Sequence, residues 1–332
     1  MKMKKKSHTV TVKDVARNAG VSTATVSRVL NGDPKVKKDT ADLVREAIEE
    51  LGYRMNQVAR SLKTNETHSI GIIAPEFSND FFMNIVTGVE KELKKHGYSV
   101  ILCSSSENTG KEKEQIQLLN DKNVDGAIII PGSSLGSHFS LFREKPIVLV
   151  DRMVDGFETD AVLSDNFKGT YDAVQYSVNK GAVRIGFLGG NMNLTSAKER
   201  YEGYLTALKD NNLSVDESII LFGDYHSQSG YVLMKTLMGQ TVPPEHIFIS
   251  NYFMHLGAAR YLLESGNDVK GLHILSFDDL PLAAFFPYSS IIVAQPMEEI
   301  GQKAADLLIK RIQGLKEKPR IIRLPTIMKI VD

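Results

Sequence analysis

The sequence predicts two units of different fold class, an all-α helix-turn-helix headpiece and a larger α/β body with two lobes. Two observations carry this prediction. A short N-terminal stretch repeats apolar residues at helical spacing on either side of a glycine, and from residue 68 onward strand-like runs alternate with helical stretches. The chain of 332 residues is also too long for one ordinary core. We place the headpiece at residues 1–55, a linker at 56–64 and the body at 65–332.

Residues 10–31 predict two short helices joined by a tight turn. Thr11 is expected to cap the first helix, with Asp14 near its positive end, and Gly20 allows the sharp corner. Ser22 is expected to cap the second helix. The residues that fall on the inner faces are Val12, Val15, Ala16, Ala19, Val26, Val29 and Leu30.

The outer face of the second helix carries small and polar side chains, which are Thr23, Ala24, Thr25, Ser27 and Arg28. Such a face fits a DNA major groove. Short side chains let the helix sit close, hydroxyl groups reach phosphates, and an arginine can pair with a guanine edge. A purely structural helical hairpin is the alternative, but it would not need so many small polar residues beside an arginine.

A third helix is expected to complete the headpiece. Thr40 is the candidate cap and Gly52 the residue that ends the helix. Its apolar stripe is Leu43, Val44, Ala47, Ile48 and Leu51. Three helices in about 45 residues make a small bundle of marginal stability on its own.

Charge is unevenly placed along a chain whose net charge is zero. Residues 1–63 hold 14 Lys and Arg against 7 Asp and Glu, a net +7, and the remaining residues hold 26 against 33, a net −7. A basic headpiece on an acidic body indicates a polyanion partner for the headpiece alone.

The composition also indicates the cellular compartment of the protein. Cys103 is the sole cysteine, so no disulfide forms within the chain, and it is expected to be buried in a strand. No apolar stretch approaches the ~20 residues that cross a bilayer, and the basic N-terminus does not lead into an apolar signal segment. We expect a cytoplasmic protein. No sequence motif for a metal or a cofactor is present among these residues.

The body repeats strands and helices in two series. The first series has strands at 68–74, 98–103, 125–130 and 146–150 and helices near 80–96 and 110–123. The second has strands at 183–188, 218–222, 246–250 and 272–277, with helices at 167–180, 197–211, 228–239, 254–265 and finally 297–313. This repetition predicts two parallel sheets covered by helices, with ligands at the C-terminal edges of the strands.

The headpiece resembles the DNA-binding domain of the lactose/galactose-repressor (LacI/GalR) family. The resemblance rests on the order Asp14-Val15-Ala16, Ala19-Gly20-Val21-Ser22 and Thr25-Val26-Ser27-Arg28-Val29-Leu30-Asn31. It implies a sequence-specific transcriptional regulator, a repressor, that binds pseudo-palindromic double-stranded operator DNA as a homodimer. The DNA-binding residues that it implies are Thr11, Ser22, Thr23, Ala24, Thr25, Ser27, Arg28, Asn31, Tyr53, Asn56, Arg60 and Leu62.

The linker resembles the hinge helix of the same family, which orders on DNA. Leu62 matches the leucine that wedges into the minor groove at the operator centre; packing of Leu62 onto Val58 is the alternative. Met55 stands where the family usually has a proline. Loss of that proline removes some preorganisation, so hinge folding is expected to depend more on DNA contact.

The body is similar to the type I periplasmic-binding-protein fold that the family carries. That fold joins its lobes by three crossings, which we place near 161–166, 293–297 and 320–326. Lobe 1 is then expected at about 65–163 and 297–322, and lobe 2 at about 164–294 and 325–332.

The same resemblance implies a small-molecule effector, a sugar or sugar derivative, between the lobes. The effector-binding residues that it implies are Asn79, Phe81, Phe82, Ser196, Arg200, Tyr225, Tyr252, Asp278 and Gln295. Tyr252 departs from the pattern, because sugar-responsive members usually have an aspartate there. The ligand is therefore less sugar-like, or another group replaces that carboxylate. No leucine heptad follows the body, so the expected assembly is a dimer without a tetramerising tail.

Two alternatives remain open at this point. One is a DNA-binding regulator that answers to a protein partner and not to a small ligand. The other is a serine hydrolase using Gly132-Ser133-Ser134-Leu135-Gly136, with Asp151 or Asp165 followed by His226, His246 or His273 in triad order. That short motif is weak in a chain with 25 glycines, and we expect no enzyme.

Overall fold

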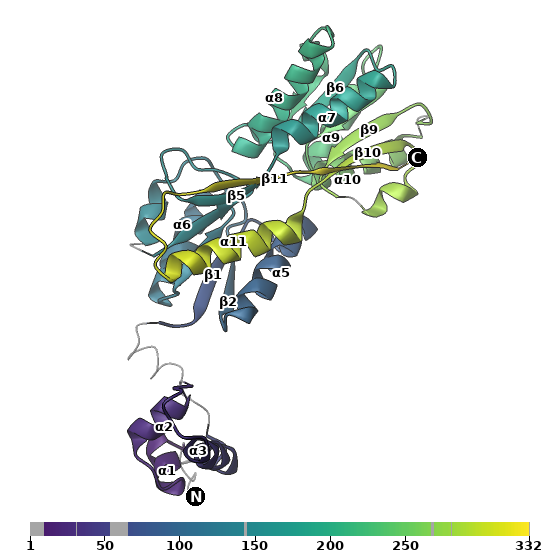
Figure 1. The fold of residues 1–332 in the computed structure, drawn as a ribbon. Helices are drawn as coiled ribbons and strands as arrows, with labels where there is room; N and C mark the ends of the chain where they lie inside the picture. The colour runs from purple at the N-terminus through teal and green to yellow at the C-terminus, as the bar shows by residue number, and fades with distance from the viewer. Residues whose placement is uncertain are drawn as a thin grey trace, which may run out of the picture. The chain divides into compact units, whose positions relative to one another are not determined.

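The structure is a computed structural model that describes residues 10–30, 32–53, 66–142, 145–266, 269–279 and 281–331. The chain divides into two compact units, residues 1–67 and residues 68–332. Figure 1 shows the helices of the first unit and the two lobes of the second.

The first unit is a bundle of α1 (Val12–Asn18), α2 (Thr23–Leu30) and α3 (Lys38–Glu50). The first two helices start as the sequence predicts. Thr11 is the N-cap of α1, and its hydroxyl and amide donate to the Asp14 carboxylate at 2.7 and 3.0 Å. The Ser22 hydroxyl accepts from the amide of Thr25 at 3.1 Å. Gly20 turns the corner with φ +64°, a conformation that costs glycine little. The residues buried between the helices are Val15, Ala16, Val26, Val44 and Ala47.

Two expectations for the third helix are wrong. Lys37 and not Thr40 is the N-cap of α3, since the helix already begins at Lys38 and Asp39 lies in its first turn, near the positive end. Leu43 is 53% exposed, whereas Ala41 is buried with Val44 and Ala47. The buried residues recur every three positions, and Leu43 lies about 100° around the helix from that face.

The first lobe of the body is a six-stranded sheet in the order β11-β5-β4-β3-β1-β2, all parallel. Its strands are β1 (Ser69–Ala74), β2 (Ser99–Ser104), β3 (Gly126–Ile129), β4 (Ile147–Val150), β5 (Asp160–Ser164) and β11 (Ile321–Leu324). Two helices, α5 (Asp80–Lys95) and α11 (Met297–Ile312), cover one face. The other face packs against α6 (Thr109–Asp121) and the short η1 (Ser137–Phe142).

The second lobe repeats this plan with the order β12-β10-β9-β8-β6-β7. Its strands are β6 (Ile185–Gly189), β7 (Ile220–Phe222), β8 (His246–Ile249), β9 (His273–Phe277), β10 (Ser289–Ala294) and β12 (Ile327–Val331). Only the β10–β12 pair is antiparallel among the described pairs of this sheet. One face of this sheet packs against α7 (Asn166–Asn179) and α8 (Thr195–Asp210), and the other face packs against α9 (Ser227–Met238) and α10 (Tyr252–Ser265). The lobe also contains two short 3-10 helices, η2 (Glu217–Ile219) and η3 (Pro281–Phe285).

The chain passes between the lobes at three places, from β5 to α7, from β10 to α11 and from β11 to β12. The last passage is visible in Figure 1 as one yellow ribbon that runs along both lobes. Because all three connections are short, the lobes can change their separation only by bending these segments.

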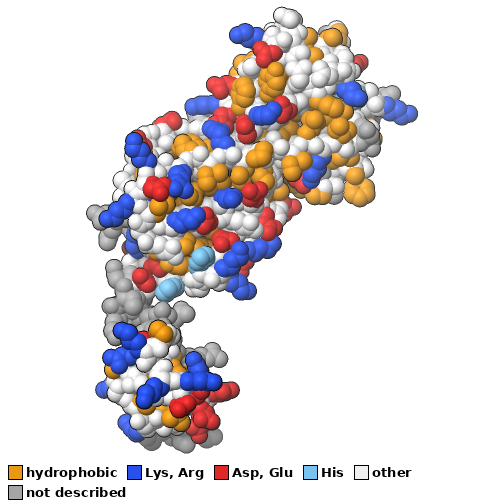
Figure 2. All heavy atoms as spheres, in the orientation of Figure 1, with side chains coloured by type: hydrophobic (Ala, Val, Ile, Leu, Met, Phe, Trp, Pro, Cys, Tyr) orange, Lys and Arg blue, Asp and Glu red, His pale blue; other side chains and the backbone are white. Residues whose placement is uncertain are grey.

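Four strands, β5, β10, β11 and β12, are not among those predicted from the sequence. The last two are sheet edges, so only one side of each is hydrogen-bonded and their side chains do not show the pattern of a buried strand. Several of their apolar side chains stay exposed, and these are Ile321, Ile327, Met328 and Ile330. Figure 2 shows that hydrophobic side chains lie at the surface of both lobes. Among the described residues, no helix is both long enough and apolar enough to cross a bilayer.

Candidate functional site

The outer face of α2 is a polar surface held in place by a buried inner face. Thr23, Ala24 and Arg28 are exposed, and Thr25 and Ser27 are half-buried. Val26 on the opposite side of the helix has no exposed surface. Among the described residues the Arg28 guanidinium forms no ion pair, so its donors are available to a partner.

The other predicted DNA-binding residues have different surroundings. Thr11 is exposed, but its hydroxyl already donates to Asp14. Tyr53 is half-buried and packs against the core of the headpiece. Four further predicted positions, Asn31, Asn56, Arg60 and Leu62, lie outside the described residues.

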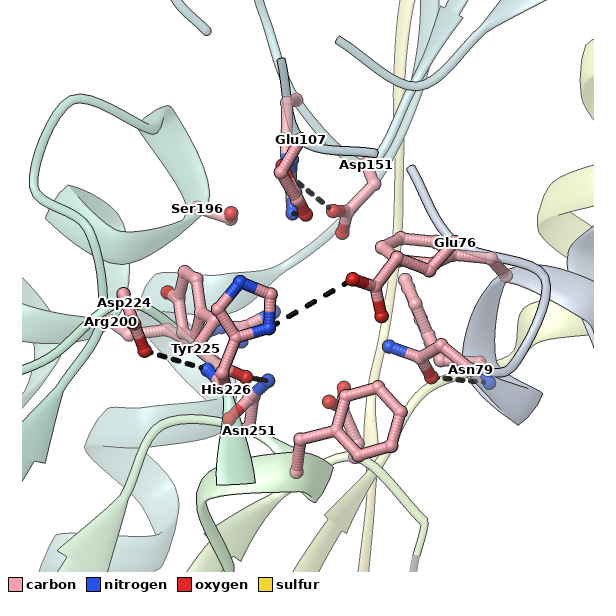
Figure 3. Close-up of a pocket in the computed structure, with 15 residues that line it drawn as sticks. Glu76, Asn79, Glu107, Asp151, Ser196, Arg200, Asp224, Tyr225, His226 and Asn251 are labelled. Carbon is pink, nitrogen blue, oxygen red and sulfur yellow. Dashed lines mark hydrogen bonds and ion pairs between the residues drawn. The ribbon is translucent and has the colours of Figure 1, made fainter. Parts of the chain in front are cut away.

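A pocket lies between the two lobes of the body; about 470 Å³ within its bounds is not filled by protein atoms, and part of this volume is open to solvent. Its polar side chains follow β1, β2 and β4 on one side and β7, β8 and β9 on the other, together with the start of α8. Figure 3 shows these side chains converging on a common space. The pocket therefore lies where parallel α/β sheets bind ligands, at the carboxyl ends of their strands.

The pocket brings together seven of the nine predicted effector residues, which are Asn79, Phe81, Phe82, Ser196, Arg200, Tyr225 and Asp278. Gln295 lies behind the pocket wall, where its side-chain amide donates to Oδ1 of Asp278 at 2.5 Å. The Tyr252 side chain lines a neighbouring cavity, and its backbone amide donates to Oδ2 of Asp278 at 3.1 Å. Gln295 and Tyr252 therefore contribute to the site indirectly, through their hydrogen bonds to Asp278.

Arg200 enters the pocket from the second turn of α8 and is 4% exposed. Its Nε donates to Oδ1 of Asn166 at 2.8 Å and its Nη1 to the carbonyl oxygen of Ser250 at 2.5 Å. The guanidinium lies 3.8 Å above the centre of the Phe277 ring. These contacts fix the plane of the guanidinium and use two of its nitrogens, so Nη2 is the nitrogen left for a ligand.

The lobe 1 side of the pocket contains a buried group of charges. Arg152 donates from Nη1 and Nη2 to the two carboxylate oxygens of Glu107 at 2.8 and 3.0 Å, and its Nε lies 3.3 Å from Oδ2 of Asp151. Burial opposes the charge of Arg152, but the combined effect of Glu107, Asp151 and Tyr225 is larger, so the pKa of the guanidinium lies above its ordinary value. Burial also raises the pKa of the Asp151 carboxyl, although Arg152 and Arg200 act against the increase.

Several residues that line the pocket have strained backbones. Glu107, Asp151, Tyr225 and Asp278 have φ values of +53°, +67°, +70° and +74°. The left-handed region costs a residue with a side chain about 1–2 kcal/mol. Strain of this kind persists where the surrounding structure requires it, and its concentration at one pocket is typical of a functional site.

Side chains also connect the lobes around the pocket. Glu76 of lobe 1 and His226 of lobe 2 approach to 3.9 Å across the opening, as the dashed line in Figure 3 marks. Behind Arg200, the Asn166 side-chain amide donates to Glu199 at 3.2 Å, and Glu199 accepts from both terminal nitrogens of Arg323 at 2.6 and 3.0 Å. Asn166 and Arg323 flank two of the three passages between the lobes.

Comparison with known proteins identifies both units. Residues 11–56 match the sequence profile "Bacterial regulatory proteins, lacI family", and residues 67–331 match "Periplasmic binding proteins and sugar binding domain of LacI family". The chain belongs to the LacI family. It is therefore a DNA-binding transcriptional regulator and not an enzyme.

Individual LacI-family proteins resemble the chain over nearly its whole length. It is 33% identical over 318 residues to the HTH-type transcriptional repressor PurR of Pasteurella multocida, covering 95% of each chain. The Lac repressor dimer bound to operator and the anti-inducer ONPF is 25% identical, with a TM-score of 0.83 and 98% of each chain covered. The complex of the transcriptional regulator CelR with cellobiose is 27% identical, with a TM-score of 0.72, and covers 96% of this chain and 98% of that one.

The hydrolase alternative fails on the structure as well as on family membership. A nucleophile elbow joins a strand to an α-helix and exposes its serine, whereas Ser134 is buried and the segment leads into the 3-10 helix η1. His138, the histidine nearest in sequence, is bonded to Glu112 at 2.6 Å. In the part of the chain that the structure describes, no group of three His, Cys, Asp or Glu side chains could hold a metal ion.

Eight residues that line the pocket are not among the predicted effector residues, and these are Glu76, Glu107, Asp151, Arg152, Asp224, His226, Asn251 and Phe253. A usable signal was present. Asp151 directly follows the apolar strand β4, just as Asp278 follows β9. A polar residue directly after a buried parallel strand faces the carboxyl edge of the sheet, and applying that rule to every strand would have found Asp151.

Gly190 provides a test of the pocket in this LacI-family protein. A β-carbon at this position would lie 2.1 Å from the Tyr225 ring, so Gly190→Ala must displace that ring from the pocket wall. We expect effector affinity to fall by about 10-fold or more while operator affinity stays within about 2-fold, because the headpiece is a separate unit. Isothermal titration calorimetry and DNA-binding anisotropy measure the two quantities. An unchanged effector affinity would show that Tyr225 does not shape the ligand site.

Proposed function

We propose that this LacI-family protein is a dimeric repressor, and that a small polar effector bound between its lobes controls its affinity for a pseudo-palindromic operator. The observation that carries the effector half is the pocket itself. It collects buried polar groups, and three of their atoms have no hydrogen-bond partner among the described residues: Oδ1 of Asp151, Nε of Arg152 and the hydroxyl oxygen of Tyr225. Buried polar atoms without partners are costly, and a bound ligand would satisfy them.

On the DNA side, α2 is proposed to lie in the major groove with Arg28 against a base edge. A two-fold operator requires two headpieces, and the protein is proposed to supply them as a homodimer in the cytoplasm, where its DNA lies. Thr11, Ser22 and Tyr53 would position the headpiece on phosphates. Asn56, Arg60 and Leu62 are proposed to act at the central minor groove as hinge residues.

On the effector side, the proposed ligand is sugar-like, in keeping with the ligand named for the CelR complex. Asp278 would accept hydrogen bonds from ligand hydroxyls, with Gln295 and the Tyr252 amide holding its carboxylate in place. Arg200 would donate from Nη2, and the Phe81 and Phe82 rings would contact the ligand ring. This combination of apolar faces and a few fixed polar groups is typical of small-molecule sites.

The effector signal is proposed to leave the pocket through Arg200. A ligand that hydrogen-bonds to Nη2 would shift the guanidinium and so alter its hydrogen bond to Asn166. Because Asn166 also donates to Glu199, the same shift would alter the ion pair between Glu199 and Arg323. These residues lie at the passages between the lobes, so ligand binding would favour one lobe separation over another. The change in separation would then alter whether the hinge segments of the dimer can meet on DNA.

The test begins with an operator selected from random and genomic duplexes by the full-length protein. Operator affinity is then measured by fluorescence anisotropy with and without a panel of sugars, nucleosides and nucleobases. We expect one ligand class to change the affinity of the wild-type protein. Asp278→Asn should remove that response while operator affinity without ligand stays within about 3-fold, whereas Glu202→Gln, an exposed charge loss on α8, should change neither.

Two results would contradict the proposal. Failure to retain any duplex at low ionic strength would exclude operator binding. A normal ligand response of Asp278→Asn would remove this residue from the effector site. A protein that binds its operator but no small molecule would instead favour control by a protein partner.

A further inference from the structure

Helix α6 of lobe 1 carries a carboxylate that is completely buried. The Glu112 side chain has no exposed surface, and it does not line the pocket. A buried carboxylate is costly unless hydrogen bonds satisfy its oxygens, and an apolar residue would pack at this position without that cost. Burial raises the pKa of the Glu112 carboxyl, although the Gly132 amide, His138 and Arg152 act against the increase. The surroundings of this carboxylate therefore indicate a specific role.

Glu112 connects the two ends of the glycine- and serine-rich loop at residues 132–136. Its Oε2 accepts a hydrogen bond from the backbone amide of Gly132 at 2.8 Å, where the loop begins. Its Oε1 is hydrogen-bonded to Nε2 of His138 at 2.6 Å, in the η1 helix that follows the loop. Both carboxylate oxygens are thus used, and together they hold the two ends of the loop in place.

The first peptide unit of this loop also contacts the charged pair of the pocket. The Pro131 carbonyl oxygen accepts from Nη1 of Arg152 at 2.9 Å, and Glu107 accepts from both terminal nitrogens of the same guanidinium. A β-carbon on Gly132 would lie 3.5 Å from the backbone of Glu107, so the loop packs against that residue too. The Pro131 carbonyl and the Gly132 amide belong to one planar peptide unit. Glu112 and Arg152 are therefore linked through this single rigid group.

Arg152 presents a donor to the pocket, and the direction of that donor depends on these contacts. Nε of Arg152 is buried and has no hydrogen-bond partner among the described residues, although Oδ2 of Asp151 lies 3.3 Å away. The guanidinium carbon lies 5.8 Å from the centre of the Phe82 ring, which also lines the pocket. Such a donor binds a ligand well only when the groups behind it fix its direction, and the Pro131 carbonyl is one of those groups.

We propose that Glu112 is a positioning residue for the effector pocket. Through the Pro131–Gly132 peptide it holds the guanidinium of Arg152 in place, and it does not contact the effector itself. The inference rests on the proposed small-molecule control and adds to it a residue outside the pocket lining. The role requires a hydrogen-bond acceptor for the Gly132 amide and not a negative charge. Glutamine can therefore replace Glu112, whereas an apolar residue of similar shape, such as methionine, cannot.

Hydrogen exchange at arginine side chains tests this role without any effector. The full-length protein is prepared with isotope-labelled arginine, and the exchange of each Nε–H proton with solvent is followed by NMR. The signal that is missing from Arg152→Lys is assigned to Arg152. In Glu112→Met we expect this proton to exchange at least about 10-fold faster, because the Pro131–Gly132 peptide loses its support. In Glu112→Gln its exchange should stay within about 3-fold of wild type, because the amide oxygen still accepts from Gly132.

Two controls distinguish positioning from general loosening of the fold. Arg200 is buried in lobe 2 with its Nε also hydrogen-bonded, so its exchange should not change in Glu112→Met. Glu114→Gln, an exposed charge loss on α6, should leave both arginine signals unchanged. Unchanged exchange at Arg152 in Glu112→Met would overturn the inference, and so would an equal increase at Arg152 and Arg200.

The exchange measurement remains decisive if Glu112→Met does not fold. Glu112→Leu is then the second apolar variant, and the same acceleration at Arg152 is expected. The wild-type protein provides a check that needs no variant: the Arg152 proton should exchange about as slowly as that of Arg200. Rapid exchange of the Arg152 proton in the wild-type protein would overturn the inference.

The effector response provides a second readout. The panel of sugars, nucleosides and nucleobases is titrated against wild type, Glu112→Met and Glu112→Gln. For the panel member that changes operator affinity, we expect binding to be at least about 10-fold weaker in Glu112→Met and within about 3-fold of wild type in Glu112→Gln. Equal binding by wild type and Glu112→Met, or an equal loss in both variants, would overturn the inference. If no panel member acts on wild type, the proposed small-molecule control fails, whereas the exchange measurement still decides the role of Glu112.

Discussion

Replacing Arg28 by alanine is expected to weaken binding to the selected operator by about 5- to 150-fold, or ~1–3 kcal/mol, and to relax base choice at one position of each half-site. Arg28 is exposed on α2, has no ionic partner among the described residues and lies on the same helix as the fully buried Val26. Because the helix is fixed by its core face, the substitution removes a side chain from the outer face without loosening the bundle. Anisotropy titrations against the operator and its single-base variants measure the effect.

A matched substitution distinguishes the loss of a contact to a base from the loss of general electrostatic attraction to DNA. Arg45 is also exposed, lies on α3 and, among the described residues, forms its ion pair with Asp42 of the same helix. Arg45→Ala removes the same positive charge, so it should weaken operator and random DNA by a similar, small factor. Arg28→Ala should affect the operator far more than random DNA. Equal losses on both duplexes would mean that Arg28 contacts phosphate alone, and the proposed base contact would be wrong.

Local sequence patterns, such as helix caps and apolar runs, are sufficient to predict the headpiece and most of the body. The capping of α1 and α2 by Thr11 and Ser22 follows from short-range hydrogen bonding that any helix start requires. The buried strands of both sheets show as unbroken apolar runs because helices cover both of their faces. Local rules do not decide the roles of Thr40 and Leu43. The N-cap of α3 lies three residues before Thr40, at Lys37, and the neighbouring helices determine which face of α3 is buried.

The pocket was only partly predictable, because its polar residues act on one another across long sequence distances. Asp278 could be identified from its place after a buried strand, but its two supports, Gln295 and the backbone amide of Tyr252, depend on how three segments meet. Glu107 follows β2 and Arg152 follows β4, two strands that are not neighbours in the sheet, and no short motif predicts that their side chains pair. Residue type and strand position therefore predict which side chains can enter the cleft, whereas the tertiary fold decides which of them remain free to bind.

The largest effect on effector control is expected from Arg200→Lys. Lysine keeps the positive charge but lacks the planar fork, so one ammonium group cannot reach Asn166, Ser250 and a ligand from the same position. We expect effector affinity to fall by about 100-fold, or ~2.7 kcal/mol, with operator affinity in the absence of effector within about 3-fold of wild type. Calorimetry with the active ligand and anisotropy with the operator measure the two quantities on the same preparation.

Lys198→Gln is the control for this substitution, since Lys198 lies on the same helix with its side chain exposed and should leave effector affinity unchanged.

A second variant, Glu199→Gln, distinguishes effector binding from transmission of the effector signal to the DNA-binding unit. The substitution weakens the ion pair with Arg323, and Glu199 does not line the pocket. If Arg200 transmits the signal through Asn166 and Glu199, Glu199→Gln should bind effector within about 3-fold of wild type but change operator affinity less on binding. A full operator response in Glu199→Gln would exclude this route, and an unaltered effector affinity in Arg200→Lys would exclude Arg200 as a ligand contact.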